Sequence, residues 1–289
     1  MALETVRLPD PRPISVSSAT GTAANAAIRI AHLDKVFITV RNERVHALDD
    51  ISLTVKDKEF VTIVGPSGCG KSTLLKIIAG LLPASSGQLR VVDQPVLKPR
   101  RDIGVVFQSP VLLPWRTVLE NVLLPAEVQH LPSGPTRARA RDLLKMVGLA
   151  DFENKYPGEL SGGMQQRAAI SRGLICDPAI LLMDEPFGAL DAMTREQMNL
   201  DLQRIWRESG KTIVLITHSI PEAVFLGDRV VVMTPRPGRI ACTIDVPLPR
   251  PRGLDAMGDP AFGRLTSDIR RLLYSLSDAA PAHEGGGLG

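Results

Sequence analysis

Long apolar runs are missing from this 289-residue sequence. Its longest uninterrupted apolar segments, such as 179–183 and 230–233, have the length of buried strands, whereas a membrane-spanning helix needs roughly 18–20 apolar residues. The first residues also lack the apolar core of a secretory signal peptide. We therefore expect a chain that does not cross a membrane by itself.

The sequence also has few cysteines and a small net charge. Cys69, Cys176 and Cys242 form an odd set without metal-ligand spacing, and a reducing cytosol suits them best. The formal net charge is only +3, with basic residues scattered along the chain, so the composition does not indicate a nucleic-acid partner. A hydrophobic content of 44% is enough for a substantial core, as one domain with an appended lobe or as two small domains.

The sequence instead alternates strand and helix patterns. Strands are expected at 28–37, 45–55, 59–65, 179–185 and 211–218, and a hairpin at 229–246 that turns at 236–238. The expected helices cover 71–81, 117–128, 136–149, 164–174, 194–209 and 264–276. Buried strands that alternate with helices predict an α/β fold with a mostly parallel sheet.

We divide the chain into three parts. Residues 1–27 are rich in Pro, Ser, Thr and Ala without periodicity and are expected to form a disordered arm. Residues 28–246 form the main domain, with a helical lobe inserted at about 109–173. Residues 247–289 are expected to form a short extension with one helix and a flexible, glycine-rich tail.

A glycine-rich loop follows the strand expected at 59–65. It matches the pattern G-x-x-x-x-G-K-[ST], with a strand before it and a helix after it. Glycines let backbone N–H groups wrap around phosphates, Lys71 reaches the terminal phosphates, and the Ser72 hydroxyl can bind Mg²⁺. The candidate nucleotide-binding residues are Gly65, Pro66, Ser67, Gly68, Cys69, Gly70, Lys71, Ser72 and Thr73. Because Cys69 lies within this loop, we expect a bulky thiol reagent to inhibit turnover and the bound nucleotide to protect against it.

Polar side chains also follow other apolar strands. Asp184 and Glu185 end one strand, His218 ends another, and Gln108 follows an apolar run. Ligands of parallel sheets bind beyond the carboxyl ends of the strands, so Asp184 is placed to hold Mg²⁺ and Gln108 can add an amide oxygen. Glu185 can position and deprotonate a water, and His218 can contact the γ-phosphate. A solvated strand-end acid and a capping histidine are the plainer alternatives.

Besides the helix that follows the glycine-rich loop, another helix begins in a way that suits an anion. The stretch 161–163, Ser-Gly-Gly, precedes a segment of good helix formers. Such a start leaves backbone N–H groups without partners and pointing outward. One phosphate loop is enough for one nucleotide, so this second anion site needs a separate explanation.

Together these segments resemble the ATP-binding subunit of an ATP-binding-cassette (ABC) transporter over about residues 28–246. Residues 160–167 are similar to the signature motif of that family, 106–108 to its Q-loop, 181–186 to its Walker B strand, 189–191 to its D-loop and 216–218 to its switch histidine. The resemblance implies a P-loop NTPase core with a mostly parallel sheet, an N-terminal antiparallel β part and an inserted helical lobe. It also implies ATP and Mg²⁺ as ligands, and ATP hydrolysis with Lys71, Glu185 and His218 as catalytic residues.

The architecture of that family implies two copies that pair head to tail. The signature segment of one copy would then contact the γ-phosphate held by Lys71 of the other through Leu160, Ser161, Gly162, Gly163 and Met164. Met164 stands where the family commonly has glutamine. Asp191 would lie at the dimer interface. Phe37 would stack on adenine, an ordinary core aromatic being the alternative.

The resemblance also implies partners. Such a subunit carries no solute itself, so it would be cytoplasmic and peripheral on the inner face of the membrane, joined to two permease subunits and, indirectly, to a solute-binding protein. Trp115 is the candidate docking residue, with a buried lobe aromatic as the alternative. Segments 112–122 and 220–240 are similar to importer ATPases for nitrate, sulfonate, taurine and related solutes. A non-transport ABC-type ATPase acting on ribosomes or DNA, and a GTPase or nucleotide kinase, are the competing interpretations.

Overall fold

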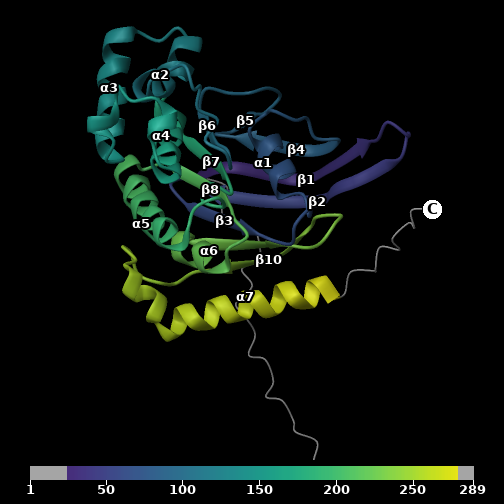
Figure 1. Ribbon diagram of the computed structural model, residues 1–289. Helices are drawn as coiled ribbons and strands as arrows, with labels where there is room; N and C mark the ends of the chain where they lie inside the picture. The colour runs from purple at the N-terminus through teal and green to yellow at the C-terminus, as the bar shows by residue number, and fades with distance from the viewer. Residues whose placement is uncertain (1–24, 279–289) are drawn as a thin grey trace, which may run out of the picture.

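The computed structural model describes residues 25–278, which form two sheets and the helices around them (Figure 1). The terminal segments 1–24 and 279–289 of the expected arm and tail lie outside the described residues. The first sheet is antiparallel, in the order β2-β1-β4-β5. Its strands are β1 (Ala26–Ile38), β2 (Arg44–Lys56), β4 (Ser86–Val91) and β5 (Gln94–Pro95). Strand β1 therefore starts two residues before the strand expected from residue 28, because Ala26 pairs with Lys56 and Ala27 is buried.

The second sheet has the order β10-β9-β3-β8-β7-β6. Neighbouring strands pair in parallel from β9 to β6, and β10 is antiparallel to β9. The strands are β3 (Phe60–Val64), β6 (Ile103–Val106), β7 (Ile180–Asp184), β8 (Thr212–Ile216), β9 (Arg229–Met233) and β10 (Ile240–Asp245). The expected α/β class and the hairpin are confirmed. Because the parallel strands end at one edge of the sheet, the residues that follow them gather there.

The parallel strands are apolar on both faces because both faces are covered. In β8, Ile213 and Leu215 pack into the core under the helices, whereas Val214 and Ile216 pack into the core between the two sheets. Successive strand residues point to opposite faces, so this division follows from the strand period of two. Each such buried side chain contributes about 1.5–3 kcal/mol relative to its exposure.

Helix α1 (Lys71–Ile78) lies between the sheets and supplies Leu74, Leu75, Ile77 and Ile78 to the core there. Three helices follow β6 and precede β7 in the chain: α2 (Val118–Val128), α3 (Ser133–Met146) and α4 (Gly162–Leu174). They pack on one another and form the lobe at the upper left of Figure 1. The 3-10 turns Ala150–Phe152 and Pro157–Glu159 connect α3 to α4. Thr117 and Glu120 form the expected capping box of α2, a motif whose cap residue stabilises a helix by about 1 kcal/mol.

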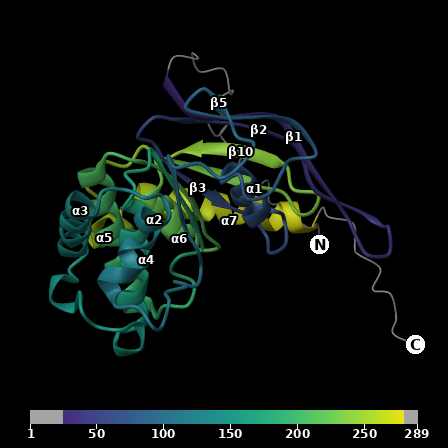
Figure 2. The ribbon, with the colours of Figure 1, turned by 90° about the horizontal axis from the view of Figure 1, so that it is seen from above.

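Helices α5 (Ala192–Ser209) and α6 (Ile220–Leu226) cover the second sheet, and α7 (Pro260–Asp278), preceded by the 3-10 turn Leu254–Gly258, packs against α6 (Figures 1 and 2). Arg252, which is buried, fastens this last segment. Its guanidinium donates to the carbonyls of Val224, Phe225 and Gly227 at the end of α6, at 2.9, 2.9 and 2.7 Å. Burial lowers the pKa of Arg252 to about 10. Within residues 25–278, no helix combines the length and the apolar character needed to span a bilayer.

Candidate functional site

The glycine-rich loop connects the end of β3 to the start of α1. Gly68 and Gly70 have φ angles of 74° and 104°, which L-residues rarely adopt. A Cβ on Gly70 would lie 2.7 Å from the Leu48 side chain, so only glycine fits there. The buried Lys71 ammonium donates to the carbonyls of Gly65 and Pro66, both at 2.9 Å. The loop therefore places its lysine and the first N–H groups of α1 together.

Cys69 does not point into this loop's open side. Its side chain is 1% exposed and belongs to the core between the sheets. Burial raises the pKa of the thiol above its ordinary value, so little reactive thiolate forms. This burial argues against inhibition by a bulky thiol reagent through Cys69, because the thiol faces inward. Cys176 and Cys242 are half-buried and pack against the other core.

The carboxylate at the end of β7 meets the loop directly. The Ser72 hydroxyl donates to Asp184 Oδ1 at 3.0 Å. Burial raises the pKa of Asp184, and the hydrogen bond from Ser72 opposes that shift. A partly buried carboxylate beside a hydroxyl is a donor set that suits Mg²⁺, and the cation would compensate the charge that burial penalises.

Glu185 and His218 are neighbours at the same edge of the sheet. His218 Nδ1 lies 3.2 Å from Glu185 Oε2. The Glu185 backbone is in the left-handed region, with φ at 45°, a conformation that costs energy in a residue other than glycine and is concentrated at functional sites. The imidazole is more than half exposed. The pair thus presents a carboxylate oriented by a histidine to the open side of the sheet.

Lys71, Ser72 and Glu185 line one cavity of about 250 Å³. Phe37, Val45 and Ala47 form its apolar wall, and Ser67, Gly68, Gly70, Lys71, Ser72, Thr73, Glu185 and Arg236 form the rest. Phe37 is 38% exposed, and Lys35 Nζ lies 5.0 Å from the centre of its ring. Phe37 is therefore a wall of the cavity rather than an ordinary core aromatic.

The signature segment lies outside that cavity. Ser161 is the N-cap of α4 and accepts a hydrogen bond from Met164 N at 3.3 Å. Ser161 and Gly162 are exposed, whereas the side chains of Leu160 and Met164 pack on the core. A nucleotide contact from the Leu160 or Met164 side chain is thus not supported, because both turn inward. The serine and the helix start remain available at the surface.

The start of α5 lies beside the signature segment. A Cβ on Gly163 would lie 2.8 Å from Thr194 Cγ2, and one on Gly162 would lie 3.5 Å from Leu190 Cδ2. Asp191 is the N-cap of α5, and the hydrogen bond from Thr194 N lowers the pKa of its carboxyl. Two helix starts and the loop between Glu185 and Asp191 therefore share one surface.

Gln108 and Trp115 lie on the segment after β6. A Cβ on Gly188 would lie 3.4 Å from Gln108 Nε2 and 3.8 Å from His218 Cε1, so the amide is close to the Glu185–His218 pair. Gln166 of α4 donates to the Phe107 carbonyl at 3.4 Å, which links the helical lobe to this segment. Trp115 is 71% exposed and is not a buried lobe aromatic.

Three further residues were not identified from the sequence. Arg236 lines the cavity from the β9–β10 turn. Arg195 donates to the carbonyls of Phe187 and Leu190 and so braces the loop after Glu185. Glu222 is buried in α6, and burial raises its pKa to about 7. The hairpin turn itself was expected, but the turn pattern carries no information about which neighbour the arginine reaches.

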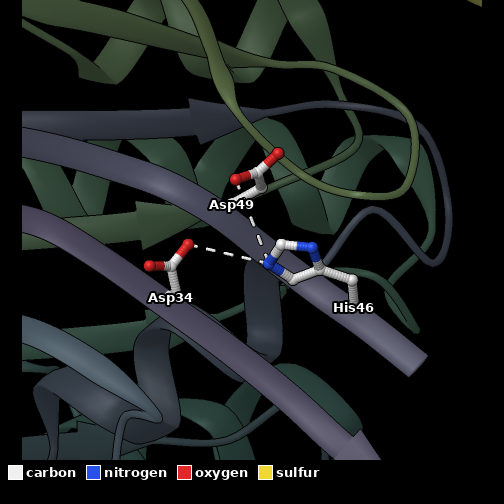
Figure 3. A group of neighbouring side chains, drawn as sticks. All are labelled: Asp34, His46 and Asp49. Carbon is white, nitrogen blue, oxygen red and sulfur yellow. Dashed lines mark ion pairs between the residues drawn. The ribbon is translucent and has the colours of Figure 1, made fainter. Parts of the chain in front are cut away.

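A separate polar cluster joins β1 to β2 (Figure 3). His46 Nε2 lies 3.6 Å from Asp34 Oδ1 and 4.0 Å from Asp49 Oδ1. The carboxylates have other partners: Asp34 accepts from Asp50 N and from the Ser86 hydroxyl, and Asp49 accepts from Arg239. The hydrogen bond from the Asp50 N–H lowers the pKa of Asp34. This cluster ties the first sheet together and reaches the β9–β10 turn.

Comparison with known proteins places these features in context. Residues 48–188 match the family model described as ABC transporter. An ABC transporter ATP-binding protein of Methanocaldococcus jannaschii is 50% identical over 78% of this chain and 84% of its own length. A taurine import ATP-binding protein of Rhizobium johnstonii is 45% identical over 88% of this chain and 99% of its own. An ATP-binding cassette solved as a dimer in a post-hydrolysis state with ADP and Pi has a TM-score of 0.67 at 36% identity, over 78% of this chain and all of that one.

Proposed function

Because the chain belongs to the family of ABC transporter ATP-binding proteins, we propose that it hydrolyses ATP to energise the import of a small solute such as taurine, nitrate or a sulfonate. It is an ATPase and an ATP-binding subunit of an importer. The single observation that carries the mechanism is that Lys71, Ser72 and Glu185 line one cavity, while Asp184 accepts from Ser72 and His218 lies against Glu185.

The hydrolytic step follows from these positions. Lys71 exchanges its two carbonyl partners for phosphate oxygens and stabilises negative charge on the γ-phosphate. Glu185 accepts the proton of a water whose oxygen attacks the γ-phosphorus, and the bond to the bridging oxygen of ADP breaks. His218 holds the carboxylate in place and contacts the γ-phosphate. Ser72 and Asp184 would hold Mg²⁺, which neutralises charge on the β- and γ-phosphates when bound; Gln108 would be a further ligand.

Two copies are needed to complete the site. Ser161 and Gly162 are exposed and do not line the cavity of their own chain, and the neighbouring start of α5 presents Asp191 at the same surface. A related cassette was solved as a dimer with ADP and Pi. We therefore place the helix start of one copy against the γ-phosphate bound by the other. An anion at a helix start gains about 0.3–2 kcal/mol, so loss of the γ-phosphate loosens the closed dimer.

The exposed Trp115 supports docking on separate membrane subunits. A large aromatic at 71% exposure, next to the segment that carries Gln108, offers an anchor for a permease. In this arrangement the chain is peripheral on the inner face of the membrane, with two permease subunits and a solute-binding protein supplied by other chains. Those chains set the solute.

Replacement of Glu185 tests the chemistry. Glu185→Gln keeps the shape but cannot accept the proton, so we expect turnover to fall by about 10²–10⁴-fold while ATP binding is retained. Glu208→Gln, an exposed carboxylate at the far end of α5, is the matched control and should hydrolyse ATP at the wild-type rate. Wild-type turnover in Glu185→Gln would refute the assignment. Stimulation by ribosomes or DNA, rather than by permease in vesicles, would favour the non-transport alternative.

A further inference from the structure

Arg236 is the charged residue of the cavity that no motif accounts for. It lies in the turn between β9 and β10, and its Nε and Nη2 donate to the Gly68 carbonyl of the phosphate loop at 3.3 and 3.2 Å. It lines the same cavity as Phe37 and Lys71. A turn far along the chain thus places a guanidinium directly on the loop that binds phosphate.

The turn is held firmly against that loop. A Cβ on Gly238 would lie 2.0 Å from the Cys69 carbonyl oxygen, so the turn backbone touches the phosphate loop. Gly238 N donates to the Ala47 carbonyl, and Asp49 N donates to the Gly238 carbonyl, both at 3.0 Å. Arg239 Nε donates to Asp49 Oδ2 at 2.7 Å.

The cluster of Figure 3 extends this anchor, because His46 lies between Asp49 and Asp34. The turn is therefore joined to both β1 and β2 as well as to the phosphate loop. Arg236 sits on a fixed support rather than on a freely moving tip.

The charge of Arg236 has no acidic partner in residues 25–278, in contrast to that of Arg239. A guanidinium has five N–H donors, and the Gly68 carbonyl accepts from only two of its nitrogens. Nη1 is left to reach a ligand. The cavity already holds the Lys71 ammonium, and Glu185 is the acidic residue among those that line it. Two cationic groups at one cavity select an anionic ligand, and a planar fork of donors suits phosphate oxygens.

We propose that Arg236 is a nucleotide-binding residue that contacts the phosphate chain of ATP beside the phosphate loop. This inference rests on the proposed function, since it takes ATP as the ligand of the cavity. The contact adds to the loop N–H groups and Lys71, and it selects nucleotides by their phosphates rather than by their base.

Equilibrium binding of ATP and ADP tests the proposal. Arg236→Ala is expected to weaken both by about 5–30-fold, the range of a partly exposed charge-assisted hydrogen bond. Arg236→Lys should retain part of the affinity. The loss should shrink as salt is raised from 50 to 500 mM (about a threefold shorter Debye length). Arg90→Ala removes an equal charge from β4, away from the cavity, and should bind ATP as the wild type does.

Arg236→Gln distinguishes a contact with the phosphates from a purely structural hydrogen bond to the phosphate loop. Glutamine can donate to the Gly68 carbonyl but has no charge, so our proposal predicts affinity close to that of the alanine variant. Wild-type affinity in Arg236→Gln, or a change of less than about twofold in Arg236→Ala, would overturn it. Lys71→Ala reports on the proposed function itself: if it binds ATP as tightly as the wild type, the ATP site is misplaced. If Lys71→Ala loses affinity for ATP and the Arg236 variants do not, the cavity is the ATP site but Arg236 does not bind the nucleotide.

Discussion

Replacement of Gly163 by alanine tests the contact between the signature helix and α5. The added Cβ would lie 2.8 Å from Thr194 Cγ2, closer than carbon atoms approach without movement. Thr194 cannot turn away freely, because it is β-branched and its N–H donates to Asp191 Oδ1 at 3.0 Å. Either α4 or the start of α5 must therefore shift.

The size of the effect follows from two opposing terms. Overpacking of this kind costs about 1–3 kcal/mol, and alanine in a helix is favoured over glycine by about 0.8–1 kcal/mol. The net loss of unfolding free energy in Gly163→Ala is thus about 0–2 kcal/mol. In a protein of this size it corresponds to a fall in Tm of up to about 8 °C.

Thermal unfolding of four proteins measures this contact: wild type, Gly163→Ala, Thr194→Ser and the double variant. Serine lacks the clashing methyl group, so the double variant should recover most of the loss, with a coupling energy of about 0.5–2 kcal/mol. Gly162→Ala is the matched control, because its Cβ makes an ordinary 3.5 Å contact. It should fold at least as well as the wild type but hydrolyse ATP more slowly, since Gly162 is exposed where our proposal puts the nucleotide of the second copy. Strictly additive stabilities in the four proteins would refute the reasoning.

Three further substitutions or measurements test other parts of the structure. Burial raises the pKa of Glu222 from an ordinary 4.5 to about 7, so its contribution to stability is present below pH 4.5 and is lost as pH rises to 7. Glu222→Gln should therefore gain up to about 3 kcal/mol over wild type between pH 5 and 8 in urea unfolding, and parallel pH profiles would contradict this. Arg252→Met leaves buried carbonyls without donors and should cost about 1–3 kcal/mol for each carbonyl left unsatisfied; an unchanged urea midpoint would show that the guanidinium does not anchor the last segment. Cys69 should react slowly with a bulky maleimide whether or not MgATP is present, and rapidly only in denaturant; fast labelling of the folded protein would contradict its burial.

The core strands and the helices with clear periodicity were predictable from the sequence. The segment 59–65 is apolar throughout and ends at glycines, and it forms β3 followed by the phosphate loop. The same logic placed Asp184 at the end of β7 and His218 just beyond the end of β8. The site could be predicted because the carboxyl ends of parallel strands meet at one edge of the sheet, whatever their separation along the chain.

Helix α6 and strands β4 and β5 have sequence patterns too weak to predict them. All residues of α6 from Glu222 to Leu226 are buried, so it has no polar stripe to indicate a helix. Strand β4 is mostly exposed, with only Leu89 and Val91 buried, and strand β5 has two residues. Their existence depends on pairing with β1 and with each other, which no local pattern encodes.

Long-range polar contacts were beyond sequence reasoning for the same reason. Arg236 meets Gly68 across 168 residues, and the local Pro-Gly turn pattern does not specify that partner. The inward direction of Cys69 was also missed, because membership of the loop does not indicate which face a side chain takes. The first depends on how the hairpin packs on the loop, and the second on the core between the two sheets.

Sedimentation of the Glu185→Gln variant, with and without MgATP, tests the composite site most directly. Since hydrolysis is blocked, the closed form should accumulate: we expect a monomer without nucleotide and a dimer at saturating MgATP. The double variant Glu185→Gln/Ser161→Arg should bind ATP and remain a monomer. A Glu185→Gln protein that stays monomeric in saturating MgATP, even with its permease, would contradict the account.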